Sequence, residues 1–252
     1  MTAPIRATLA AGLLFAAAGP VHDGWAADRA VRIQTPPPLR KGIDAMPQIA
    51  DPADDAERRI NAALKRLDAN VLKSTKACPG HDWTRTVEAP MAGPGYLSVT
   101  VTDGFYCNGA AHPNASLYSI VYDLNTGKPV DWPQLLPPPL VGKQALAEQS
   151  DGTRIVTLSS PRLFALYTAG YTADGATGDD IRDCKEAVAT EGEDGPPAMM
   201  AWLDAKKGGL AVQFDLPHVV KLCEQAVIIP VKTLREAGAN PALLEALEAA
   251  LR

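Results

Sequence analysis

The chain has 252 residues, of which 46% are hydrophobic and 21% charged, so a wholly disordered or collagen-like protein is excluded. This length fits one generous globular domain or two small ones. Its 24 basic and 29 acidic residues give a net charge of -5, which argues against nucleic acid or an anionic membrane as the partner.

The first 26 residues have the features of a secretory signal peptide. Arg6 gives a positive start, residues 7–18 are apolar, and the small residues Gly24 and Ala26 predict cleavage after Ala26. An uncleaved anchor is the alternative, but the apolar run is shorter than the ~20 residues that span a bilayer. We therefore expect a periplasmic or secreted protein with no membrane anchor after cleavage.

Residues 27–51 are rich in proline and predict an extended linker ahead of a single domain at 52–252. A helix is expected from Asp51-Pro52, since Asp can cap a helix and Pro suits its first turn. The next residues repeat at helical spacing and form one apolar stripe: Ile60, Leu64, Leu67 and Val71. The basic residues off this stripe are interpreted as a solvated face. They are Arg58, Arg59, Lys65 and Arg66.

Alternating apolar residues predict strands at 83–88, 96–102 and 117–124. After Pro137-Pro138-Pro139 the pattern turns helical as far as about Ala173. Further along, we expect a short helix around Cys184, a hairpin formed by residues 199–203 and 210–214, and a strand at 227–229. Asn240-Pro241 predicts the start of a final amphipathic helix.

Four cysteines in an exported chain predict disulfides. We expect Cys78 with Cys107 and Cys184 with Cys223, because sequential pairing keeps each bridge within one local set of elements. The alternative is a zinc site, in which Cys78, His81, Cys107 and His112 would be the ligands.

Two segments carry a family resemblance, Tyr106-Cys107-Asn108-Gly109-Ala110-Ala111-His112-Pro113-Asn114 and Tyr122-Asp123-Leu124-Asn125-Thr126-Gly127-Lys128. They resemble segments of the domain of unknown function DUF3298, which usually follows DUF4163. The closing part, from Leu210 to about Leu234, is also similar. The resemblance implies an α+β fold in which an antiparallel sheet packs with helices. Members of this family include the lysozyme-binding extracellular part of an anti-sigma factor and accessory domains of peptidoglycan deacetylases.

The polar segment 106–114 is the candidate binding site, formed by Tyr106, Asn108, His112 and Asn114. Such a loop can also serve only to close a turn, because Asn and His side chains bond neighbouring backbone groups. We expect a binding module of the cell envelope, whose partner is a lysozyme-like protein or a peptidoglycan fragment.

Enzyme motifs such as G-x-S-x-G, H-E-x-x-H and the P-loop are absent from the sequence, and no cofactor or resident metal is expected. The chain is therefore interpreted as a binding protein rather than an enzyme. The alternative is an envelope hydrolase that acts on carbohydrate or peptidoglycan. It would use His112 together with carboxylates near the strand ends, such as Asp103, Asp123 and Asp131.

Overall fold

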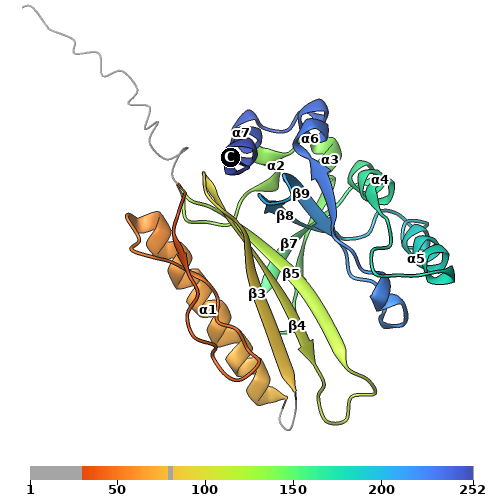
Figure 1. Ribbon diagram of the computed structural model, residues 1–252, viewed down its shortest axis with the longest axis horizontal. Coiled ribbons are helices and arrows are strands. Elements are labelled where there is room, and N and C mark those ends of the chain that lie inside the picture. Colours follow the sequence, from red (N-terminus) through yellow and green to blue (C-terminus); the bar gives the residue numbers. More distant parts are fainter. Residues whose placement is uncertain (1–29, 79–81, 252) are drawn as a thin grey trace, which may run out of the picture.

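The computed structural model describes residues 30–78 and 82–251, and the strands in these ranges form four antiparallel sheets (Figure 1). The predicted signal peptide, with its cleavage after Ala26, lies outside the described residues. The strands are β1 (Ile33–Gln34), β2 (Gln48–Ile49), β3 (Trp83–Ala92), β4 (Tyr96–Phe105), β5 (Asn114–Asp123), β6 (Lys143–Glu148), β7 (Arg154–Ser159), β8 (Met200–Asp204), β9 (Gly209–Gln213) and β10 (Val227–Pro230).

Helices lie between groups of these antiparallel strands along the chain, so the α+β fold class is confirmed. The helices are α1 (Asp55–Ala77), α2 (Trp132–Leu135), α3 (Pro138–Val141), α4 (Pro161–Gly170), α5 (Asp179–Thr190), α6 (Val231–Ala237) and α7 (Pro241–Ala250), with a 3-10 helix η1 at His218–Cys223. None of the helices in the described ranges is both long and apolar enough to cross a membrane.

Helix α1 packs along one face of the sheet β3-β4-β5 (Figure 1). Its predicted apolar stripe is buried, and three of its members, Ile60, Leu64 and Leu67, share a core with Tyr118 and Tyr122 of β5. The other face of β5 lies against β8, where the Ser119 hydroxyl donates to the Ala201 carbonyl at 3.1 Å. The sheet is therefore covered on both faces.

The second core lies under the helices of the C-terminal half. It joins the strands β8, β9 and β10 to α4, α6 and α7, and Leu163, Tyr167, Phe214 and Leu247 are buried in it. The hairpin predicted around residues 206–209 is β8–β9, and the predicted final helix is α7, capped by the Asn240 side chain. Here local sequence signals and tertiary packing agree.

Three expectations need correction. Helix α1 begins three residues later than expected, because Asp54 rather than Asp51 caps it by accepting a hydrogen bond from the Glu57 amide at 2.9 Å. The stretch expected to be helical up to Ala173 contains the β6–β7 hairpin, and only α3 and α4 are helical there. β-branched residues at Ile155, Val156 and Thr157 favour strand over helix.

The third correction concerns the expected linker. Residues 30–51 do not connect separate units but pack against the first sheet and α1, with Val31, Met46 and Ile49 buried in the same core as α1. Two side chains of α1 fasten this segment. Asp68 accepts a hydrogen bond from the Met46 amide, and Asn61 bonds both the amide and the carbonyl of Ile49.

Candidate functional site

The polar loop predicted as the binding site joins β4 to β5 at one end of the first sheet. The Cys78–Cys107 disulfide ties it to the end of α1, and Gly109 has a φ of 87°, which its lack of a side chain permits. Tyr106 is 43% exposed. The loop is therefore held firmly and presents an aromatic ring to solvent.

Side chains of this loop bond neighbouring backbone groups. The Asn114 side chain accepts from the Ala115 amide at 2.9 Å, and His112 Nδ1 lies 3.0 Å from the Pro113 carbonyl. Such bonds are those of a loop that closes a turn, and they are compatible with a further ligand. The role of Tyr106, Asn108, His112 and Asn114 in binding stays a prediction.

Two of the three carboxylates considered for hydrolysis, Asp103 and Asp123, do not come together. Asp123 pairs with Tyr96 in the β4–β5 register, and Asp103 lies seven residues further along β4. At about 3.3 Å per residue the two are roughly 23 Å apart, far beyond the ~5–9.5 Å that glycosidases use. Asp103 is moreover buried, and Asp131 accepts a hydrogen bond from Gln134 at the start of α2.

Both predicted disulfides are present, Cys78–Cys107 and Cys184–Cys223. The first of them contradicts the zinc alternative, since it consumes the two thiols that would have to bind the metal as thiolates. His81, the third ligand of that alternative, lies outside the described residues. Two disulfides fit an oxidising compartment.

A buried ionic cluster holds the first sheet to the turn between β6 and β7. Arg85 of β3 donates from Nη2 to Asp103 of β4 at 2.8 Å and to Asp151 of that turn at 2.6 Å. The three side chains have no solvent exposure. Tyr118 of β5 donates its hydroxyl to Asp151, and Trp83 donates its indole N–H to Asp103.

The pKa values in this cluster follow from burial and charge. Burial alone would raise the pKa of Asp151, but hydrogen bonds from Arg85 and Thr153 outweigh it and hold that pKa below its usual range. Burial also raises the pKa of Tyr118, so its hydroxyl stays protonated and remains a donor. The cluster therefore keeps the turn fixed, and Thr153 receives an additional bond from Asn70 of α1 at 3.4 Å.

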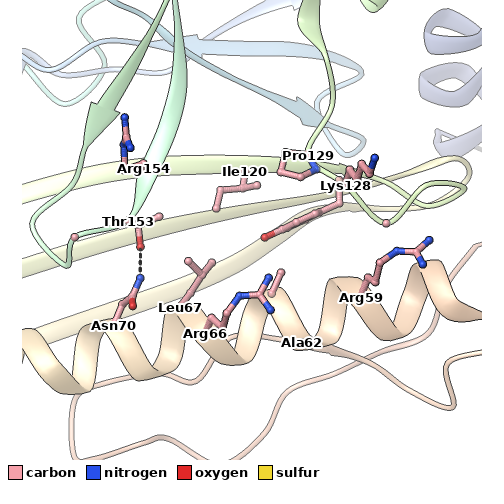
Figure 2. Close-up of a pocket in the computed structure, with 14 residues that line it drawn as sticks. Arg59, Ala62, Arg66, Leu67, Asn70, Ile120, Lys128, Pro129, Thr153 and Arg154 are labelled. Atoms are coloured by element: carbon pink, nitrogen blue, oxygen red, sulfur yellow. Dashed lines mark hydrogen bonds between the residues drawn. The ribbon is translucent and has the colours of Figure 1, made fainter.

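A groove opens between this fixed turn and α1. Figure 2 shows its lining, which comes from α1, from β5, from the turn after β5 and from the β6–β7 turn. The groove has a volume of about 730 Å³, within the range of ligand sites. Its floor is apolar and includes Leu67, Ile120 and Pro129.

The rim of the groove is cationic, with Arg59 and Arg66 from α1 and Lys128 after β5. Arg154 at the start of β7 also lines the groove, but its guanidinium points away from α1 (Figure 2). The lining contains no acidic residue. Within the described residues, none of the four cations forms an ion pair with a carboxylate. Four positive charges therefore gather on a chain whose net charge is -5.

Arg59 and Tyr122 have further roles in the groove. The Arg59 guanidinium donates a hydrogen bond to the Thr126 carbonyl at 3.0 Å, which fixes the turn after β5 against α1. Burial raises the pKa of Tyr122 to about 12, against the opposing charge of Arg66, so the phenol is protonated at neutral pH. The arrangement can hold an anionic group beside an apolar body.

Sequence reasoning assigned Arg59 and Arg66 to a solvated helix face, and it gave Lys128 and Arg154 no role. The four residues come from three segments up to 95 positions apart, and only the packing of α1 across the sheet brings them together. The one feature of the local sequence that points to this site is the spacing of Arg59 and Arg66, which places them two helical turns apart on one side of α1.

No family model matches the sequence, and no curated protein matches it. Two crystal structures of DUF3298 family proteins do match the fold. The one from Pseudomonas aeruginosa PAO1 is 13% identical and aligns with a TM-score of 0.52 over 86% of this chain and 97% of its own. The one from Bacteroides fragilis NCTC 9343, also 13% identical, aligns with a TM-score of 0.47 over 76% of this chain and 68% of its own.

The Pseudomonas match agrees with the resemblance that the loop segments carry. The DUF4163-like part stays a prediction, since the comparisons contain no counterpart for it. The chain has the fold of a DUF3298 family protein.

Proposed function

We propose that this protein is a non-catalytic binding module of the bacterial cell envelope, whose groove between α1 and β5 takes an anionic peptidoglycan-derived fragment. The observation that carries the proposal is the cationic rim of that groove, with four basic side chains and no acidic residue in the lining. Export by a signal peptide, with the envelope location that it implies, is part of the proposal.

The chemistry of the ligand follows from the groove. Peptidoglycan fragments combine carboxylates on their stem peptides with apolar methyl groups on the sugars and alanines. Carboxylates suit Arg66, because guanidinium groups bind them with paired hydrogen bonds. The apolar groups suit the floor formed by Leu67, Ile120 and Pro129. A cationic protein such as lysozyme would instead be repelled from this rim.

Calorimetric titration with a soluble disaccharide-tetrapeptide tests the proposal. We expect Arg66→Gln to weaken binding about tenfold, since a hydrogen bond to a charged group contributes about 1.5–3 kcal/mol. Lys232→Gln is the matched control, because Lys232 is 85% exposed on α6, away from the groove. A chitin tetrasaccharide, which lacks carboxylates, should not bind. Equal binding of the disaccharide-tetrapeptide and the chitin tetrasaccharide, or an affinity that Arg66→Gln does not lower, would refute the anionic ligand.

The predicted loop supports a second candidate, the binding of a lysozyme-like protein. The disulfide at Cys107 fixes the loop, and Tyr106 presents an exposed ring of the kind that dominates protein interfaces. The net charge of -5 would steer a cationic partner towards the chain. If the wild type captures lysozyme and Tyr106→Ala does not, this candidate is supported. If Tyr106→Ala still binds lysozyme, the loop is not the binding site.

A further inference from the structure

Strand β6 is an open sheet edge. It pairs with β7 on one side, and no strand pairs with its other side within residues 30–78 and 82–251. Five of its six residues are exposed, and it contains neither a proline nor a bulge. Natural proteins protect their edge strands by such devices and by charged side chains. The charged residues of β6, Lys143 and Glu148, stand at its two ends, so the middle of this edge is open to another strand.

The hydrogen-bond pattern shows which backbone groups of β6 point outwards. The Gln149 amide donates to the Thr153 carbonyl at 2.7 Å, and the Thr157 hydroxyl donates to the Ala145 carbonyl at 3.4 Å. Residues 145 and 149 therefore direct their backbone groups towards the β7 side. Because the direction alternates along a strand, the amides and carbonyls of Gln144, Leu146 and Glu148 point away from β7.

The side chains of these three residues share one face of the hairpin. Leu146, at the middle of the strand, is 59% exposed. Its cross-strand neighbour is Val156, which packs against the larger core. The apolar row that runs outwards from the core thus ends at an uncovered leucine on the edge.

We propose that β6 pairs antiparallel with β6 of a second copy of this chain, with the two-fold axis at Leu146. The backbone groups that point away from β7 belong to Gln144, Leu146 and Glu148. In an antiparallel pair formed through these groups, the three residues of one copy lie opposite the same three residues of the other copy. Centred on Leu146, the register places Gln144 opposite the partner's Glu148, so an amide can donate to a carboxylate at both ends.

This register is self-complementary in two respects. Leu146 covers the partner's Leu146, and the row Val156–Leu146 continues through the axis as one apolar line across four strands. The pairing also uses every outward backbone group of the strand, while a shift by two residues would leave Leu146 opposite a polar side chain. A second copy therefore fits this edge, because its own β6 supplies the matching leucine. Because one strand pair is a small contact, a weak dimer is expected.

Sedimentation velocity of the mature chain over a wide concentration range tests the proposal. Wild type should shift from monomer to dimer as the concentration rises. Leu146→Lys and Leu146→Glu should each weaken the dimer at least tenfold, because they place like charges at the axis. An equimolar mixture of the two variants should dimerise again. Leu222→Lys, which alters a leucine that is 65% exposed in η1, is the matched control and should behave as wild type.

Three outcomes would overturn the proposal. They are a wild type that stays monomeric at every concentration, a Leu146→Lys variant that dimerises as wild type does, and a mixture of the charged variants that stays monomeric. Circular dichroism of each variant checks folding, and the exposure of Leu146 predicts no loss. Dimer formation through β6 does not depend on the ligand of the groove. The dimerisation test can therefore fail or succeed independently of the binding test of the proposed function.

Discussion

The arginines of this protein fall into two contrasting groups. Arg85 is completely buried and contacts two carboxylates, whereas Arg66 and Arg154 are exposed in the lining of the groove and form no ion pair within the described residues. Burying an unpaired charge is very costly in free energy, so the fold requires the two carboxylates that pair with Arg85. Exposed cations face no such requirement, and their positive charge stays available to a ligand. The charges that the fold does not need are therefore the ones that we propose for ligand binding.

Replacing Arg85 by Met should give the largest effect. It leaves Asp103 and Asp151 buried without their cation, and removal of one partner from a buried ion pair typically costs about 3–5 kcal/mol. Urea unfolding measures this loss. The matched change Arg154→Met should shift the free energy of unfolding by less than about 0.5 kcal/mol, as is usual at the surface. Similar losses in the two variants would abolish the distinction between the groups.

The Cys78–Cys107 bridge lies at the same end of the sheet and tests whether covalent or ionic contacts hold that end. The double variant Cys78→Ser/Cys107→Ser opens a loop of 29 residues, for which chain entropy predicts a loss of about 3–4 kcal/mol. Thermal unfolding of the double variant gives the value. A loss below about 1 kcal/mol would mean that the Arg85 cluster holds this end without the bridge.

The sequence predicted those features that depend on neighbouring residues. The stripe of α1, the strands β3 to β5 and the caps of the final helix follow from local spacing, and the cysteine pairs from compartment and order. The β6–β7 hairpin escaped prediction because β6 is exposed and lacks a buried alternating face. The Arg85 cluster and the groove escaped for another reason, since each unites residues whose contacts span more than 60 positions.

Asp151→Asn should have a smaller effect that depends on pH. The lowered pKa of Asp151 means that its ion pair contributes stability above the ordinary Asp pKa of about 3.9. That contribution is lost as the pH falls through the lower pKa of the folded state. We expect the variant to be about 1–3 kcal/mol less stable at pH 7 and to lose less stability than wild type on acidification below about pH 4. Parallel stability curves for the two proteins would show that Arg85 does not stabilise the Asp151 carboxylate.

The smallest effect is expected at the loop, with the double variant His112→Ala/Asn114→Ala. Both side chains are exposed, and substitutions at exposed positions usually change the free energy of unfolding by less than about 0.5 kcal/mol. Affinity for the disaccharide-tetrapeptide should stay within twofold of wild type, because neither residue lines the groove. The second candidate predicts that the same variant binds a lysozyme-like protein more weakly. If it instead loses peptide affinity while lysozyme binding is unchanged, the ligand extends from the groove to the loop, and the available charge of the rim is only part of the site.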